Sequence, residues 1–248
     1  MWILKLVVCK NYDEMSSYAA GQLKDSAAKK PNLILGLATG STPLGLYKNL
    51  INMYRNKEMD FSEVRTFNLD EYFPIDREDP QSYYYFMNQN LFSHINIRKE
   101  NVHIPDGSAA DAEKEVEKYE KMIEEAGGID VQILGSGVNG HIGFNEPDER
   151  LSLKTYKVEL TEDTIEANSR FFEDASQVPR HALTMGVGTI FKARKIFILI
   201  NGEKKVRILD EMFGGSITTN VPATLLALHP DITVITDEAT MALSLLGK

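Results

Sequence analysis

Cysteine is almost absent from this chain of 248 residues, since Cys9 is the single example. An intrachain disulfide is therefore impossible, which fits a reducing compartment. Cys9 lies in an apolar run, a setting that favours a small core residue over a nucleophile. The five histidines are scattered, and the sequence contains neither a His-x-x-x-His pair nor paired cysteines. The sequence therefore predicts no metal site.

Long hydrophobic runs and an excess of positive charge are missing as well. No apolar run reaches the ~18 residues of a membrane span, and Lys5 interrupts the apolar N-terminus, which no small-residue cleavage site follows. We therefore expect a cytoplasmic protein with no membrane partner. The formal net charge of −9 argues against a nucleic-acid partner, because such proteins present a basic face. A few local Lys or Arg side chains can still bind an anionic ligand.

The apolar residues that are present, 43% of the chain, are enough for a large core. Short apolar runs predict strands at residues 2–9, 33–37, 64–69, 101–104, 156–160, 195–200 and 232–236, with a further strand starting at residue 131. Capping residues and spacing predict helices at residues 12–29, 44–57, 111–125, 161–170, 203–213 and 237–246, and one more that Ser82 caps. This alternation predicts one α/β domain over residues 1–248, with an open, Rossmann-like, mainly parallel twisted sheet and helices on both faces.

Residues 131–147 form the most distinctive stretch of the sequence. An apolar run turns into a loop with four glycines around His141, namely Gly135, Gly137, Gly140 and Gly143. Glycines at this density let the backbone approach a ligand closely. Glu146 follows five residues after His141, and a carboxylate that orients an imidazole is typical of a positioned acid/base. The stretch therefore predicts a functional site.

Four polar or glycine-rich segments each follow a predicted strand: residues 39–42, Asp70, residues 135–146 and residues 201–205. Ligands of open α/β sheets bind at the carboxyl ends of the strands. We therefore expect these four segments, which are far apart in the sequence, to meet on one edge of the sheet.

Gly40, Ser41 and Thr42 lie between a strand and a helix, where backbone N–H groups and hydroxyls can bind an anion. Pro43 suits the first helical position. The segment is neither a Walker A motif nor a dinucleotide fingerprint, and an ordinary capped turn explains it equally well.

The remaining candidates carry charge. Asp70 and Glu71 are adjacent, and because neighbouring strand residues point to opposite faces, only one should enter the site; we choose Asp70 as a base. Arg170 and Lys205 could bind a phosphate, although each alone also fits a solvated surface charge. The residues thus predict an enzyme for a small anionic substrate, with proton transfer by a carboxylate and an imidazole.

The sequence resembles the glucosamine-6-phosphate deaminase family. The matching segments run in the family's order at residues 36–43, 67–72, 140–147 and 182–186 and in the turn from Gly202 to Lys205. The most specific of them is Gly-His-Ile-Gly-Phe-Asn-Glu-Pro at residues 140–147.

The resemblance implies conversion of glucosamine 6-phosphate and water to fructose 6-phosphate and ammonia, without a metal or organic cofactor. It implies that Asp70 moves a proton between C2 and C1 of the open-chain sugar. It implies further that His141 opens the pyranose ring and that Glu146 supports His141. The phosphate-binding set that it implies consists of Gly40, Ser41, Thr42, Arg170 and Lys205.

Two departures from the family pattern lead to expectations. Some members have Asp at the position of Asn139, where it helps to orient the histidine; an amide brings no charge, so we expect Glu146 to carry most of that role. The chain ends at Lys248, short of the tail of allosteric hexameric members, so we expect a monomer without strong activation by N-acetylglucosamine 6-phosphate. The polar residues 156–179, which include Arg170, are our prediction for a mobile lid.

Two rival functions stay open on the sequence. A 6-phosphogluconolactonase would share the fold and the phosphate loop, although residues 68–71 and 144–147 favour the deaminase. A sugar-phosphate sensor would bind without turnover, although no basic DNA-binding segment is visible and both Asp70 and His141 are retained.

Overall fold

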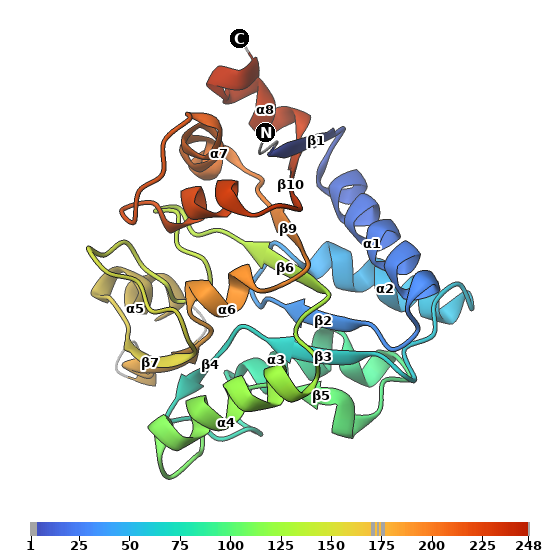
Figure 1. Cartoon of the computed structure of the whole chain (residues 1–248), viewed down its shortest axis with the longest axis vertical. Coiled ribbons are helices and arrows are strands. Elements are labelled where there is room, and N and C mark those ends of the chain that lie inside the picture. Colours follow the sequence, from blue (N-terminus) through green and yellow to red (C-terminus); the bar gives the residue numbers. More distant parts are fainter. Residues whose placement is uncertain (1–3, 170–171, 173, 175–176, 248) are drawn as a thin grey trace.

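A seven-stranded parallel sheet forms the centre of the molecule (Figure 1). The computed structural model describes residues 4–169, 172, 174 and 177–247. The strands of this sheet are β1 (Lys5–Cys9), β2 (Ile34–Leu37), β3 (Arg65–Asn68), β5 (Val102–His103), β6 (Val131–Gly135), β9 (Lys195–Leu199) and β10 (Ile232–Asp237). Their order is β1-β10-β9-β6-β2-β3-β5, and every neighbouring pair is parallel. The predicted fold class is confirmed.

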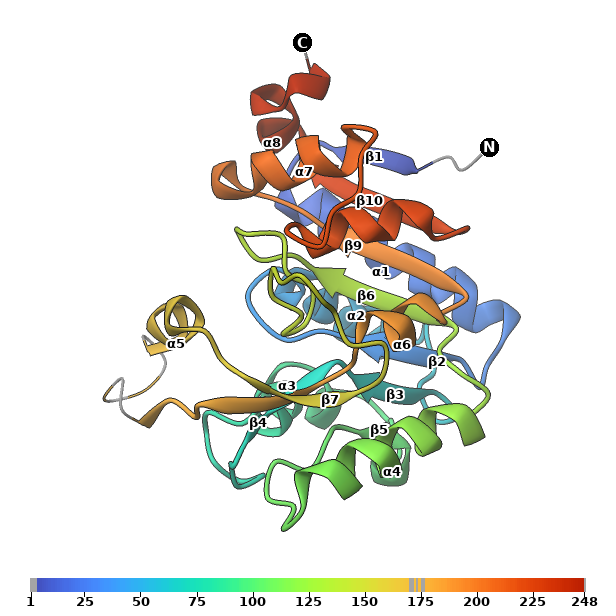
Figure 2. The same cartoon turned by 60° about the vertical axis from the view of Figure 1, so that its left-hand side comes forward.

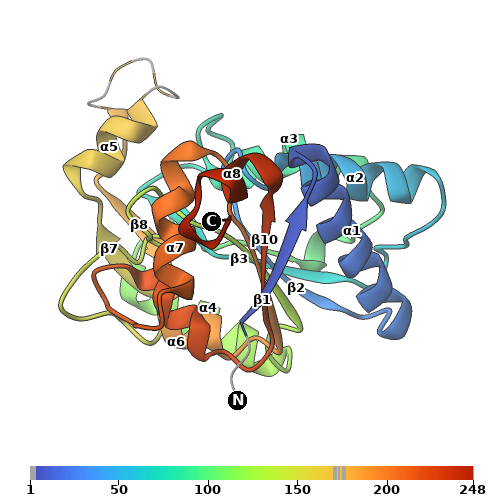
Figure 3. The ribbon, with the colours of Figure 1, turned by 90° about the horizontal axis from the view of Figure 1, so that it is seen from above.

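Helices cover both faces of this sheet (Figure 3). The helices α1 (Tyr12–Lys29), α2 (Leu44–Arg55) and α3 (Tyr83–Asn90) pack on one face, and α4 (Ala112–Glu125), α6 (Val187–Phe191) and α7 (Val206–Phe213) on the other. Because strand residues alternate between faces, Phe197 of β9 joins the first core while Ile196 and Ile198 join the second. The short helix α8 (Glu238–Leu243) follows β10. None of the described helices is long and apolar enough to cross a bilayer.

Capping side chains explain where three helices begin: Asn11 and Ser82 were predicted as caps, whereas Asp111 was placed inside its helix. The side chains of Asn11, Ser82 and Asp111 accept hydrogen bonds from the backbone N–H three residues further on, at 2.9, 3.0 and 3.2 Å. Each bond satisfies an N–H group that the first helical turn leaves unpaired. These local contacts are the reason that the starts of α1 and α3 could be read from the sequence.

A second, antiparallel sheet lies beside the first and was not predicted. It consists of β4 (Asp70–Phe73), β8 (His181–Thr184) and β7 (Tyr156–Glu159) in the order β4-β8-β7. The sequence predicted only β7, and it placed Asp70 at a strand end followed by a polar loop. Asp70 instead begins β4, where it pairs with Thr184. A strand whose partner lies more than a hundred residues away leaves little local signal.

Helix α5 (Glu162–Ser169) follows β7 and projects from the body of the molecule (Figure 2). Thr161 caps it as predicted, accepting a hydrogen bond from Thr164 N at 3.2 Å. Together β7 and α5 make up the described first half of residues 156–179, the segment that the sequence proposed as a lid.

The four predicted segments follow β2, β3, β6 and β9, which are consecutive neighbours in the sheet. The chain steps outward from β2 to β3 and β5, and then in the opposite direction from β6 to β9 and β10. The order therefore reverses between β2 and β6, and such a switch point opens a crevice at the carboxyl ends of the strands. The loops after β2 and β6 are thus placed where a ligand of this fold binds.

Candidate active site

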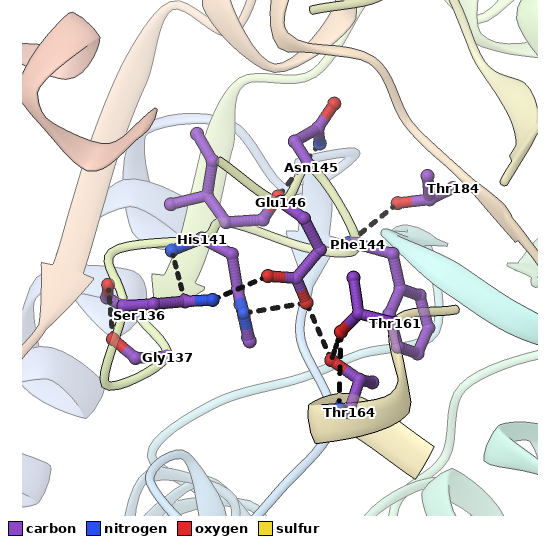
Figure 4. Close-up of polar contacts among 11 residues, drawn as sticks. Ser136, Gly137, His141, Phe144, Asn145, Glu146, Thr161, Thr164 and Thr184 are labelled. Atoms are coloured by element: carbon purple, nitrogen blue, oxygen red, sulfur yellow. Dashed lines mark hydrogen bonds and ion pairs between the residues drawn. The ribbon is translucent and has the colours of Figure 1, made fainter. Parts of the chain in front are cut away.

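His141 and Glu146 form an ion pair within the loop that follows β6 (Figure 4). His141 Nδ1 lies 3.0 Å from Glu146 Oε1, although the ring N–H does not aim straight at that oxygen. Glu146 is largely buried, while the His141 side chain keeps 28% of its surface exposed. Burial raises the pKa of Glu146, but the nearby His141 imidazole and the hydrogen bonds from Thr164 and Asn139 outweigh it and hold that pKa below its usual value. Glu146 is therefore a carboxylate that can orient the imidazole.

Asn139 contacts both members of this pair. Its Nδ2 donates to Glu146 Oε2 at 2.7 Å, and its Oδ1 accepts from the backbone N–H of His141 at 3.1 Å. An aspartate at this position could accept from the backbone N–H but could not donate to Glu146. The amide therefore adds a donor in place of a charge, and Asn139 helps to hold Glu146 and the backbone of His141.

Two glycines leave the space in which the His141 side chain and its loop pack. A Cβ on Gly137 would lie 2.3–2.6 Å from three atoms of the imidazole, so the ring rests directly on the bare backbone. Gly140 has a φ of +91°, and a Cβ there would lie 2.5 Å from Val221 Cγ1. Larger residues at either position would displace the loop, which is the physical reason for glycines around His141.

Asp70 approaches the same loop from β4. A Cβ on Gly143 would lie 3.4 Å from Asp70 Oδ2 and 2.9 Å from Thr184 Oγ1, so this carboxylate packs against the loop that holds His141. The Asp70 side chain is buried, and burial, with a smaller contribution from the neighbouring Glu71, raises its pKa to about 8. Such a carboxyl group can both take and release a proton near neutral pH.

Glu71 has a different task, as the alternation of strand residues predicted. Its carboxylate accepts hydrogen bonds from the backbone N–H groups of Tyr72, Tyr83 and Tyr84 at 2.8–2.9 Å. Burial raises its pKa, against the effect of these three donors. Glu71 therefore ties β4 to the first turn of α3, while Asp70 faces the loop with His141.

The loop after β2 reaches towards Lys205, which follows β9. Lys205 Nζ donates to Thr42 Oγ1 at 3.1 Å, and Gly40 has a φ of +94° with open space where a Cβ would lie. Burial lowers the pKa of Lys205, and no carboxylate within the described ranges forms an ion pair with it. An ammonium group beside hydroxyl and backbone donors suits a phosphate. Arg170, the other predicted cation, lies outside the described residues.

The family model of glucosamine-6-phosphate isomerases/6-phosphogluconolactonase matches residues 10–235. The chain belongs to this family. Within the glucosamine-6-phosphate isomerase/6-phosphogluconolactonase family, the glucosamine-6-phosphate deaminase of Thermoanaerobacter pseudethanolicus is 58% identical over 97% of this chain and 95% of its own. The deaminase of Clostridium beijerinckii is 55% identical over 95% of this chain and 97% of its own.

Solved structures of this family agree with the fold. A monomeric glucosamine-6-phosphate deaminase of the NagB superfamily is 40% identical, with a TM-score of 0.93, over 97% of this chain and 100% of its own. The 6-phosphogluconolactonase of Thermotoga maritima is 22% identical, with a TM-score of 0.76, over 95% of this chain and 100% of its own. The second likeness shows the fold alone.

Sequence reasoning missed two contacts that support the loop with His141, one from outside the segments that match the family and one between two of those segments. Thr164 of α5 donates to Glu146 Oε1 at 2.7 Å, the same oxygen that His141 contacts, and in turn accepts from Thr161 Oγ1 at 3.0 Å (Figure 4). Thr184 of β8 accepts from Phe144 N at 3.1 Å. The sequence predicted only that Thr161 caps a helix. Spacing within a helix does not indicate that Thr164 would contact Glu146 on another loop.

Proposed function

We propose that this chain converts glucosamine 6-phosphate and water to fructose 6-phosphate and ammonia. The observation that carries the proposal is that Asp70, from β4, packs against the loop that holds the His141–Glu146 pair. A base and an imidazole on one site are what an aldose–ketose isomerisation with loss of an amine requires. The extensive identity to named deaminases supports the same reaction.

In the proposed reaction His141 opens the sugar ring. Its Nδ1 contacts Glu146, so Nε2 is the nitrogen left to exchange a proton with the sugar. The imidazole moves a proton from the anomeric hydroxyl to the ring oxygen, which yields the open-chain aldehyde. Glu146 favours the charged imidazolium that forms during this transfer.

Asp70 then moves a proton from C2 to C1 of the open-chain sugar. The amine nitrogen gives up a proton and the C1 oxygen gains one, so that the product is an imine at C2 beside a C1 hydroxyl; water adds to C2 and expels ammonia, leaving the ketone of fructose 6-phosphate. A pKa raised to about 8 keeps the carboxylate basic enough to take the C2 proton and able to return it to C1.

The phosphate group is proposed to bind Gly40, Ser41, Thr42 and Lys205, with Arg170 as a second cation. The support for this assignment is the contact between Lys205 Nζ and Thr42 Oγ1 at 3.1 Å, which brings loops after two different strands together. Binding the remote phosphate fixes C1 and C2 relative to Asp70 and His141, which lowers the entropy cost of the proton transfers.

We also propose that the enzyme acts as a monomer and in the cytoplasm. The 40% identical solved deaminase is described as monomeric, which supports the first statement. The residues proposed for both proton transfers come from one chain, so a second copy is not needed to complete them.

The experiment that tests the function measures ammonia and fructose 6-phosphate from glucosamine 6-phosphate, with EDTA present. Both products should form in equal amounts and should be lost in Asp70→Asn. Hydrolysis of 6-phosphogluconolactone without ammonia release would replace the proposal with a lactonase. Binding of glucosamine 6-phosphate, seen as a raised Tm without either activity, would replace it with a sensor.

A further inference from the structure

Tyr12, the first residue of α1, contacts the loop after β2 with its hydroxyl group. Tyr12 Oη lies 3.1 Å from the carbonyl oxygen of Ser41 and 3.0 Å from that of Thr42, and it accepts from the backbone N–H of Gly45 at 2.8 Å. One phenolic hydroxyl thus engages three backbone groups that lie 29, 30 and 33 residues away in the sequence. This residue belongs to none of the motifs that the sequence analysis singled out.

We infer that Tyr12 is a positioning residue for phosphate binding: it holds the loop from Gly40 to Gly45 in the conformation that accepts the anion. The inference rests on the proposed function, because it takes this loop as the phosphate site. Tyr12 itself does not touch the substrate in this role.

The chemical reason lies in the direction of the Ser41 and Thr42 carbonyl groups. Carbonyl oxygens carry partial negative charge and repel a phosphate. Tyr12 holds both of them on the side of α1, sharing its single proton between them. Since a trans peptide points its N–H opposite to its C=O, the Thr42 N–H is directed away from Tyr12. The Tyr12 hydroxyl therefore holds the two carbonyl oxygens, which would repel a phosphate, on one side of the loop. The Thr42 N–H, which can donate to a phosphate, lies on the other side.

The packing around Gly45 leaves this loop little room to find another arrangement. A Cβ on Gly45 would lie 2.3 Å from Ser16 Oγ and 2.9 Å from Tyr12 Cε1, so the first turn of α2 sits directly on α1. Because Gly45 N–H is also bonded to Tyr12 Oη, the phenol links α1 to the start of α2. Loss of the hydroxyl would take this partner from the Gly45 N–H and from the Ser41 and Thr42 carbonyl groups.

Thr42 connects the Tyr12 hydroxyl to Lys205, the predicted phosphate-binding cation. Its carbonyl oxygen is held by Tyr12, while its side-chain Oγ1 accepts from Lys205 Nζ at 3.1 Å. A Thr42 that is no longer fixed from the side of α1 would present its hydroxyl to Lys205 in variable positions. We therefore expect Tyr12 to affect binding of the phosphate and to leave the proton transfers at Asp70 and His141 unchanged.

The test is Tyr12→Phe, which removes one oxygen and keeps the ring. Isothermal titration calorimetry with inorganic phosphate at constant ionic strength should give a Kd about tenfold higher than that of the wild type, the size expected when one well-placed hydrogen-bonding group is lost. In steady-state assays KM for glucosamine 6-phosphate should rise by a similar factor, while kcat changes less than ~2-fold.

Tyr18→Phe is the matched control, because it removes the same oxygen from the same helix and the hydroxyl of Tyr18 makes no hydrogen bond with the part of the chain that the structure describes. An unchanged Kd and KM in Tyr12→Phe, with a wild-type protein that does bind phosphate, would overturn the inference alone. A rise in Kd that Tyr18→Phe reproduces would also overturn it. A wild-type protein that releases no ammonia and binds no phosphate would overturn the proposed function and the inference together.

Discussion

Asp70, the proposed base, illustrates how a single residue can lower the stability of the fold. Its carboxyl group is buried, and burial raises its pKa from 3.8 to about 8. Between these two values the folded protein keeps a proton that the unfolded chain releases. The folded state therefore binds more protons, and its stability falls as the pH rises from about 4 to about 8. A residue chosen for stability alone would be uncharged.

We predict that Asp70→Asn abolishes turnover and stabilises the protein. The kcat should fall at least ~1,000-fold, because the base is gone. The Tm at pH 8 should rise by at least ~2 °C, because an amide carries no ionisation that burial opposes. Activity assays and calorimetry at pH 5 and pH 8 measure both effects, with the exposed Asp25→Asn as control. A Tm that drops at pH 8 would contradict the role given to burial.

The ionisation of Asp70 should also determine how kcat/KM of the wild-type protein depends on pH. Asp70 must be ionised to accept the C2 proton, so kcat/KM should increase with pH and level off above the raised pKa of about 8. The Kd for inorganic phosphate should not show this dependence on the ionisation of Asp70.

Glu146 and Asn139 differ in what they offer His141. Glu146 supplies a charge 3.0 Å from the imidazole, whereas Asn139 supports Glu146 and the backbone of His141. We predict that Glu146→Gln lowers kcat by ~100-fold and that Asn139→Ala lowers it by less than ~10-fold. Steady-state kinetics of both variants test this, beside Glu149→Gln as an exposed control. Equally small losses in the two variants would show that charge on Glu146 is unimportant.

At the scale of elements, α5 contacts the rest of the molecule through an apolar cluster and through a hydrogen bond. Ile165 joins an apolar cluster with Tyr72 and Phe144, while the neighbouring Thr164 donates to Glu146. The helix therefore rests on the same loop that carries His141, although it projects from the body of the fold (Figure 2). A movement of α5 away from this loop would remove the hydrogen bond from Thr164, one of the contacts that lower the pKa of Glu146.

We predict that Thr164→Val lowers kcat by ~5–10-fold, because Glu146 Oε1 loses a donor and the imidazole is held less firmly. Thr164→Ser keeps the hydroxyl and should restore most of the activity. A Thr164→Ser variant as impaired as Thr164→Val would point to packing of the methyl group instead.

Hydrogen exchange addresses the predicted lid directly. Amides of residues 156–179 should gain protection when fructose 6-phosphate binds, if this segment closes over the substrate. Exchange that the ligand leaves unchanged would exclude such a movement.

At the scale of the whole molecule, the proposed site draws on the segments that follow four neighbouring strands of one sheet. Asp70 packs against Gly143, in the loop that carries His141 and Glu146, and all three come from this one chain.

We predict a monomer with hyperbolic kinetics. Light scattering should give a mass near 27.9 kDa, and specific activity should not change on dilution. Saturation by glucosamine 6-phosphate should stay hyperbolic with and without N-acetylglucosamine 6-phosphate. A sigmoidal curve that this ligand relieves would contradict both statements.

Several features could be read from the sequence because their causes are local. The caps at Asn11 and Ser82 act within one helical turn, and strands such as β2 and β9 are short apolar runs. Glycines mark the loop around His141 because the ring and Val221 leave no room for a Cβ. Motif, spacing and residue type therefore predicted the fold class and placed His141 beside Glu146.

The antiparallel sheet and the supporting contacts could not be read in this way. β4 pairs with β8, Thr164 reaches Glu146 across 18 residues, and Tyr12 reaches Ser41 across 29. None of these pairs has a periodic or spacing signal, because its partners lie on different elements.

The sequence by itself determined which groups could do chemistry here: a carboxylate at the end of a strand, an imidazole among glycines, and hydroxyls at the start of a helix. Only the tertiary structure decided which of them meet. It buries Asp70 against Gly143, turns Glu71 away to the N–H groups of α3, and brings Lys205 to Thr42. The physical reason is that residue type is a local property, whereas desolvation and the direction of a hydrogen bond depend on neighbours that folding brings from distant parts of the chain.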